Sequence, residues 1–141
     1  MPPPDSSDID AALVGKLLAD TTLAGLMPGG VFMDEAAPGL TQFVIVSLVS
    51  EFDEPVFGQR AFEDALYLVK AVELSTVAVK HIKAAAARID AVLENGVLTV
   101  AGYTPMVMHR ESRIRLTEVD QIDPSIRWAH RGGRYRVQQS L

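Results

Sequence analysis

The stretch QFVIVSLVS, residues 42–50, constrains the fold more than any other part of the sequence. Its nearly continuous run of β-branched and aliphatic residues predicts a strand that is buried on both faces, because a half-exposed strand would alternate with polar residues. Such a strand lies inside a sheet and not at its edge. ALYLVKAVEL, residues 65–74, is predicted to return as its partner. The polar residues 51–64 between them contain Pro55 and Gly58, which predicts a long connection.

Helical periodicity is confined to two regions. Ser7 can cap a first helix, in which Ile9, Leu13 and Leu17 form one apolar stripe. A short second helix is expected after Asp20 or Thr21, before Pro28, Gly29 and Gly30 end it. A long helix is predicted from a cap at Ser75 or Thr76 to a stop at Asn95 and Gly96, with an apolar stripe at Ile82, Ala85, Ala86, Ile89 and Leu93.

The C-terminal third reads as short strands. The last two, SIRWAHR and RYRVQQS, are predicted to form a hairpin about Gly132 and Gly133. Alternation then directs Tyr135 and Val137 to the core, and Arg134 and Arg136 to the opposite face. The whole pattern predicts an α+β domain with a mostly antiparallel sheet, one long helix packed on a face and an N-terminal helix. We expect residues 8–141 to form this single domain and residues 1–7, with three prolines, an extended or disordered segment.

Composition limits the classes of protein that remain. The 141 residues include no cysteine, which excludes disulfides, thiolate metal sites and a cysteine nucleophile. No apolar run reaches the roughly 18 residues of a membrane helix, and the start lacks a secretion signal. We therefore expect a soluble protein that stays in the cell that makes it. Residues 1–75 hold twelve acidic and three basic residues, whereas residues 76–141 hold six and ten. This asymmetry favours head-to-tail association of copies.

No motif for catalysis, cofactor binding or metal binding is found. His81, His109 and His130 lack the spacing of metal ligands, and the acidic run EFDE lacks the glycine turn of a calcium loop. The glycines at 28–30 and 131–134 fit turns better than a phosphate-binding loop. We therefore expect no enzyme activity, no cofactor and no metal.

Arginine dominates the C-terminal strands and has two possible partners. It occupies seven positions there, Arg110, Arg113, Arg115, Arg127, Arg131, Arg134 and Arg136. Such strands could follow nucleic-acid phosphates, with Trp128 and Tyr135 available for stacking. The isoelectric point of about 5.1 argues against this reading. Pairing with carboxylates of the same chain or of a neighbouring copy is the favoured alternative.

Several segments together resemble the tail-completion or tail-terminator proteins of long-tailed bacteriophages. The resemblance covers nearly the whole chain after residue 7, and its segments are LAGLMPGGVF, QFVIVSLVS, ALYLVKAVEL, KHIKAAAARIDAVLENG and RWAHRGGRYRV. The proline-rich start and the extended middle loop depart from the family pattern.

The resemblance implies a non-enzymatic α+β protein of the virion neck, which assembles in the host cytoplasm. It implies a ring, typically a hexamer, at the head-proximal end of the tail tube. The ring would stop polymerisation of the tube protein and join the tail to the head connector. DNA would pass through its lumen without specific binding. No membrane partner is implied.

A ring requires two different patches on each subunit. We hypothesise that arginines on one face meet carboxylates from the region 34–64 of the adjacent subunit. The arginines are Arg113, Arg115, Arg134 and Arg136, and the carboxylates are Asp53, Glu54, Glu63 and Asp64. Residues 51–59, with Phe52 and Phe57, and the prolines at 2–4 are the candidate contacts to the tube or the connector.

Three alternatives remain from the sequence. Another neck component, such as a head-completion protein, would share the same small ring architecture. A nucleic-acid-binding module would show steep salt dependence of DNA binding. A small-molecule enzyme is the least favoured alternative, and would require a perturbed titratable group in an apolar pocket.

Overall fold

The computed structural model describes residues 7–56, 59–75, 81–94, 96–100, 102–105 and 108–140, with the backbone alone for residues 7, 51–56, 59–63, 105, 139 and 140. The predicted N-terminal segment up to residue 6 and the candidate contact Phe57 lie outside the described residues. Among the described residues, no helix is long and apolar enough to cross a membrane.

Six strands form one mixed sheet. In chain order they are β1 (Val31–Met33), β2 (Gln42–Val56), β3 (Gln59–Leu74), β4 (Thr104–Pro105), β5 (His109–Val119) and β6 (Arg127–Ser140). Their spatial order is β1-β2-β3-β6-β4, and β5 also pairs with β6. β1 runs parallel to β2, while the remaining pairs are antiparallel. The sheet is therefore the larger part of the fold.

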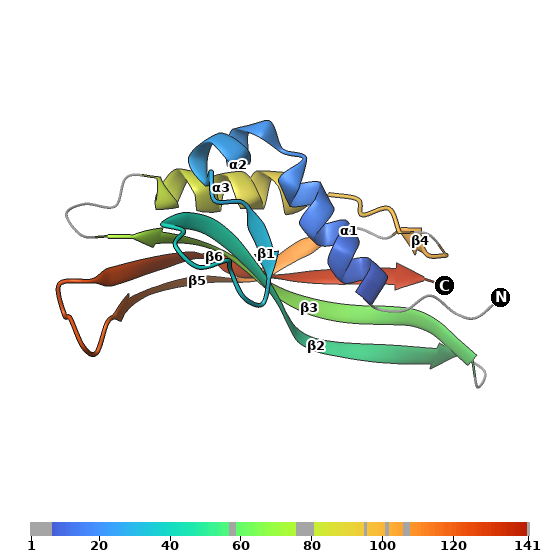
Figure 1. The fold of residues 1–141 in the computed structure, drawn as a ribbon. Coiled ribbons are helices and arrows are strands. Elements are labelled where there is room, and N and C mark those ends of the chain that lie inside the picture. The colour runs from blue at the N-terminus through green and yellow to red at the C-terminus, as the bar shows by residue number, and fades with distance from the viewer. Residues whose placement is uncertain are drawn as a thin grey trace.

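Three short helices cover one face of this sheet. They are α1 (Ser7–Leu18), α2 (Thr21–Leu26) and α3 (Ile82–Leu93), and Figure 1 shows all three on the same side. The core lies between the two layers. The α1 stripe of Ile9, Leu13 and Leu17 is buried as predicted, against strand residues such as Val44, Tyr67 and Val69. The opposite face of the sheet carries no helix among the described residues.

The predicted fold class is wrong in two respects. The sheet is mixed and dominates the fold, and none of the helices in the described residues exceeds 12 residues. The predicted long helix is shortened at its start because the Ser75 N–H donates to the carbonyl of Arg127 at 2.7 Å, which ties Ser75 to the sheet. α3 begins only at Ile82. The N–H groups of His81 and Ile82 at its start donate hydrogen bonds to the carboxylate of Glu73 on β3.

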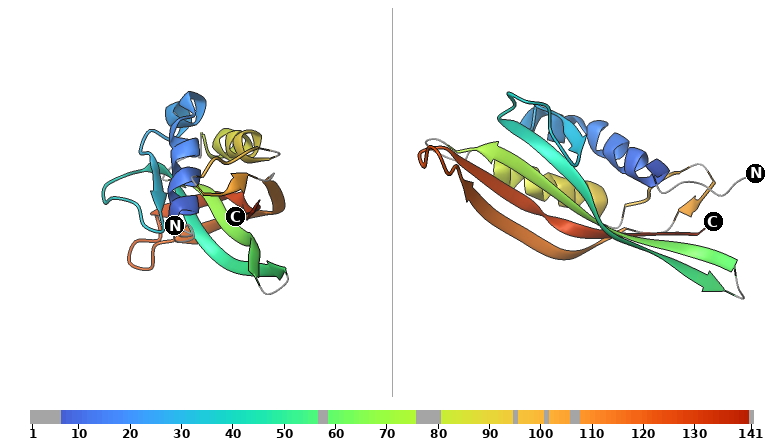
Figure 2. Two further views of the ribbon diagram at one scale, coloured as in Figure 1. Left: turned by 90° about the vertical axis from the view of Figure 1, so that its right-hand side faces the viewer. Right: turned by 60° about the horizontal axis from the view of Figure 1, so that its bottom comes forward.

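The long connection predicted for residues 51–64 is also wrong. β2 and β3 continue through it as one antiparallel hairpin, paired from Gln42–Glu73 out to Val56–Gln59. Figures 1 and 2 show this hairpin extending past the helices. Because no helix covers its end, these strands need no apolar stripe, and their polar sequence resembles that of a loop. We call residues 51–64 the acidic hairpin, since it holds five acidic residues and one arginine.

The hairpin predicted about Gly132 and Gly133 is wrong as well. Both glycines lie inside the continuous strand β6. A Cβ on Gly132 would stand 2.0 Å from the carbonyl oxygen of Val69, so the glycine permits close approach to β3. The chain turns instead at residues 120–126. There the Asp120 carboxylate accepts a hydrogen bond from the N–H of Ile122, which explains how these polar residues form the turn.

The second helix follows the sequence closely. Asp20 caps α2 by accepting a hydrogen bond from the Leu23 N–H at 2.9 Å. The same carboxylate binds the guanidinium of Arg88 on α3 at 2.6 and 2.8 Å. The hydrogen bonding of Arg88 to Asp20 is the main cause that lowers the pKa of Asp20 to about 2. One short side chain therefore both starts α2 and fastens it to α3.

Candidate interaction surfaces

The strand register distributes the arginines over both faces of the sheet. On β5, Arg110, Arg113 and Arg115 pair with Tyr135, Gly133 and Arg131 of β6. Tyr135 is a core residue, and directly opposed residues of two strands share a face. These three arginines therefore lie on the side of the helices. A β-bulge between Arg110 and Ser112 makes this possible, because the extra residue Glu111 shifts the alternation by one.

A groove lies between α3 and β5 on this helix side. Its volume is about 430 Å³, and it is lined by Lys83, Ala86, Ala87, Asp90, Arg110, Arg113, Ile114, Arg115, Arg131, Gly132 and Tyr135. We call it the α3–β5 groove. Its lining contains five basic residues and one carboxylate. The groove therefore favours an anionic ligand.

Asp90 binds two other residues that line the groove. Its Oδ1 accepts a hydrogen bond from the Tyr135 hydroxyl at 3.0 Å and lies 2.7 Å from Nη1 of Arg110. Burial is the main cause that raises the pKa of Tyr135, and the charge of Asp90 raises it further. Arg110 is thus already paired. Arg113 and Arg115 are exposed, with no ion pair to another described residue.

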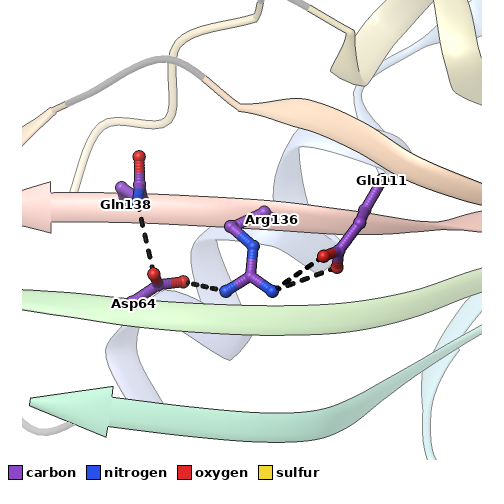
Figure 3. A network of polar contacts seen from close by, with 4 residues as sticks. All are labelled: Asp64, Glu111, Arg136 and Gln138. Atoms are coloured by element: carbon purple, nitrogen blue, oxygen red, sulfur yellow. Dashed lines mark hydrogen bonds and ion pairs between the residues drawn. The ribbon is translucent and has the colours of Figure 1, made fainter.

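Arg136 lies on the opposite face in a different environment. Its guanidinium donates to Asp64 at 2.5 Å and to both carboxylate oxygens of Glu111 at 3.1 Å. Gln138 donates a further hydrogen bond to Asp64 at 3.2 Å. Figure 3 shows Arg136 between its two acidic partners. The carboxylates raise the pKa of Arg136, with the hydrogen bond that Arg136 donates to Asp64 as the largest cause. This arginine joins β3, β5 and β6 within one chain.

The predicted interface residues therefore do not form one surface. Arg113 and Arg115 line the α3–β5 groove, whereas Arg134 and Arg136 occupy the other face, so the expected single arginine face is wrong. Arg134 is exposed there, and the predicted direction of Tyr135 and Val137 into the core is confirmed. Asp64 binds Arg136 of its own chain. Asp53, Glu54, Glu63 and Phe52 lie on the acidic hairpin, where only the backbone is described.

Sequence reasoning missed the groove residues Lys83 and Asp90, and it named Arg131 among the arginines without assigning it to the interface. A signal was present, because Lys83, Ala86, Ala87 and Asp90 recur at helical spacing along one side of α3. Which strand faces that side depends on the bulge at Glu111. No residue pattern in β5 predicts this bulge. The groove could therefore be identified only from the three-dimensional structure.

A smaller hollow of about 310 Å³ lies on the opposite face. It is lined by Asp34, Phe43, Ile45, Ser47, Lys70, Val72, Glu118, Trp128 and His130. The rings of Phe43 and Trp128 pack at a centroid distance of 6.0 Å. His130 is buried, and this burial is the main cause that lowers its pKa. Within the described parts of the chain, no three His, Cys, Asp or Glu side chains come together as metal ligands.

Two sheet edges are open among the described residues. β1 covers β2 only from Val44 to Val46, so the outer edge of β2 continues without a described strand partner from Ser47 to Val56. β5 pairs with β6 alone, which leaves its other edge open. Unpaired edges of this length present free backbone donors and acceptors to another chain. Leu48, Val49 and Leu116 are exposed apolar residues on these strands.

The architecture is a mixed sheet with a helical layer on one side, and solved structures share it. One is a chain of the virion of a native gene transfer agent particle, at 20% sequence identity and a TM-score of 0.60. The match covers 96% of this chain and 97% of that one. A second solved chain matches at 13% identity and a TM-score of 0.59, over 94% and 95% of the two chains. No family model and no curated protein matches the sequence.

Proposed function

We propose that this protein is a structural component of a phage-like virion. The observation that carries the proposal is the end-to-end fold similarity to a chain of a gene transfer agent virion. The match covers nearly the full length of both chains, which means that the similarity involves the whole fold and not a fragment of it. We also propose that the protein is not an enzyme and works through contacts with other virion proteins.

Within the virion, the proposed role is that of a tail terminator. Copies form a ring, in the simplest case a hexamer, at the head-proximal end of the tail tube. The ring stops addition of tube protein, binds the head connector and lets DNA pass through its centre. The family resemblance of the sequence and the presence of oppositely charged surfaces support this role. A heterologous contact between two such surfaces closes into a ring when its rotation permits.

The contacts along the ring axis are proposed to involve the end of the acidic hairpin. Phe52 and Phe57 are aromatic residues of this segment, and aromatic residues are enriched in protein interfaces. The hairpin extends past the helices, where a neighbouring ring of tube or connector subunits can reach it (Figure 2). The prolines at 2–4 are proposed to add to this contact.

Deletion of the gene from the genome that encodes it tests the role. Electron microscopy of the resulting particles is expected to show tail tubes of unregulated length without attached heads, and the wild-type gene supplied in trans is expected to restore both. Tubes of normal length that fail to join heads would contradict the terminator role and indicate a head-completion protein. Complete particles of normal tail length would contradict both neck functions.

A further inference from the structure

We infer that the α3–β5 groove is the docking site for the acidic hairpin of a second copy of this chain. The inference deepens the proposed function and rests on it, since it names the contact by which one subunit of the ring would hold the next. The groove and the hairpin lie on different parts of the fold. Each copy therefore uses its groove for one neighbour and its hairpin for the other.

The groove contains exposed arginines that can bind an acidic partner. Arg110 is bound to Asp90, but Arg113 and Arg115 are exposed without an ion pair to a described residue. They stand two residues apart on one strand and on one face, which places them roughly 7 Å apart. An arginine pair at this spacing fits a partner strand with carboxylates two residues apart, because each guanidinium can then bind its own carboxylate. The open edge of β5 leaves the groove accessible from the side.

The acidic hairpin supplies the matching pattern. Glu51 and Asp53 are two residues apart on β2. The Cα register places Asp53 directly opposite Glu63 on β3. Carboxylates in directly opposed positions of two strands repel one another. Arg60 is the single basic residue of the hairpin, and Arg136 is already bound to Asp64. The hairpin thus carries more acidic than basic residues, and cations of another molecule would balance this excess.

The hairpin cannot reach the groove of its own chain. In the β3–β6 ladder, Phe62 pairs with Ser140, whereas the groove lies at Gly132 and Tyr135. Asp53 lies opposite Glu63, which pairs with Gln139 of β6, six residues and roughly 20 Å of extended strand from Gly133, the partner of Arg113. Strands β3 and β6 also lie between β2 and β5. The ladder holds both strands along this distance. Contact between hairpin and groove therefore requires a second copy.

A protein segment suits the groove better than nucleic acid. Asp90 projects into the groove and would repel a phosphate backbone, and it also neutralises Arg110. The chain has a formal net charge of -5 at pH 7, so the molecule as a whole repels DNA. A short acidic strand requires only the local positive charge that the groove provides.

Disulfide trapping between two full-length variants tests the contact, because the chain has no native cysteine. Ala87→Cys places a thiol on the exposed lining of the groove, and Gln59→Cys places one on the hairpin, without changing any charge. The two proteins are produced separately, mixed and oxidised. The matched control pairs Gln59→Cys with Ile122→Cys, because Ile122 is 95% exposed and would report random collision at least as strongly. Circular dichroism checks that each variant is folded.

We expect the groove pair to give about tenfold more mixed disulfide than the control pair, because docking raises the effective concentration of the two thiols. Addition of Arg113→Glu and Arg115→Glu to the groove variant is expected to reduce the yield to that of the control. Addition of Glu51→Arg and Asp53→Arg to the hairpin variant is then expected to restore it. Equal yields from the groove and control pairs would overturn the inference. So would a groove that binds duplex DNA in place of the hairpin.

The two experiments distinguish failure of the contact from failure of the proposed role. If the groove and hairpin variants do not cross-link above the control while deletion and complementation give the expected tail lengths, the inference falls and the terminator function stands. Docking without any effect of the gene on tails would keep the contact and remove the function.

Discussion

The carboxylate of Glu73 on β3 accepts a hydrogen bond from the backbone N–H of Ile82 at 3.1 Å, and so caps the first residue of α3. The same oxygen accepts from the N–H of His81 at 3.1 Å, while the other oxygen accepts from the Gln42 side chain at 2.8 Å. Glu73 is buried, so these donors have little water available. A strand residue thereby fixes where the groove helix starts.

Replacement of Glu73 by alanine is expected to lower the free energy of unfolding by about 2 kcal/mol, because buried N–H donors then lose their acceptor. Urea unfolding followed by circular dichroism measures the change. Glu35→Ala, at an exposed position, serves as the control and is expected to stay within about 0.5 kcal/mol of the wild type. Equal stability of the two variants would contradict the capping role of Glu73.

This cap illustrates what the sequence could and could not predict. The apolar stripes of Ile9, Leu13 and Leu17 and of Ile82, Ala85 and Ile89 were predicted correctly, since periodic burial is a local signal. The start of α3 was not predicted correctly. Ser75 is a good capping residue in isolation, but its backbone N–H is bonded to the carbonyl of Arg127 in the sheet. The cap of α3 is instead the side chain of Glu73, which belongs to β3.

The candidate site was predicted only in part for a related reason. Arginine-rich strands and an acidic middle segment are visible in composition, and they suggested contacts between copies. The grouping of Arg113 with Arg134 failed because one extra residue, Glu111, changes which face each β5 side chain occupies. A bulge depends on the partner strand, so local sequence rules do not reveal it.

Gly132 is expected to tolerate no side chain. A Cβ there would stand 2.0 Å from the Val69 carbonyl oxygen and 2.6 Å from the Cα of Lys70, both backbone atoms that cannot rotate away. Gly132→Ala should therefore destabilise the protein by about 2 kcal/mol or more, as overpacking does. Gly25→Ala is the matched control. Its Cβ would meet no atom within 4 Å, and it lies in α2, where alanine favours the helix. Thermal unfolding of both variants tests this, and a neutral Gly132→Ala would contradict the close approach of β6 to β3.

Arg134 and Arg136 are neighbours on one face of β6 but are expected to respond differently to charge reversal. Arg136→Glu puts a third carboxylate beside Asp64 and Glu111, so we expect a loss of about 2 kcal/mol in unfolding free energy. Arg134→Glu changes an exposed side chain and should leave the fold intact. Urea unfolding of the two single variants distinguishes them. Equal losses would show that the ion pairs of Arg136 contribute no stability. Loss of oligomers in Arg136→Glu alone would report unfolding and not an interface.

His130 is expected to make stability depend on pH near neutrality. Burial, and secondly the charge of Lys70, lower its pKa in the fold below the 6.5 of the free side chain. The unfolded chain therefore binds a proton at a higher pH than the folded one, and stability is lost as the pH falls below about 6.5. Glu118 opposes the shift, since its carboxylate oxygen lies 3.5 Å from Nε2 of His130. Glu118→Gln should consequently steepen the loss of stability, and Lys70→Gln should weaken it.

Unfolding midpoints in urea between pH 7.5 and pH 5 measure this dependence in wild type and variants. His130→Gln removes the titrating group and is expected to flatten the curve in this window. His109→Gln is the matched control, because it makes the same substitution at an exposed histidine. If His130→Gln retained the full acid sensitivity, another group would be responsible. Because His130 lies beside Trp128 and Phe43, its protonation places a charge among apolar rings, and tryptophan fluorescence should shift in the same pH range.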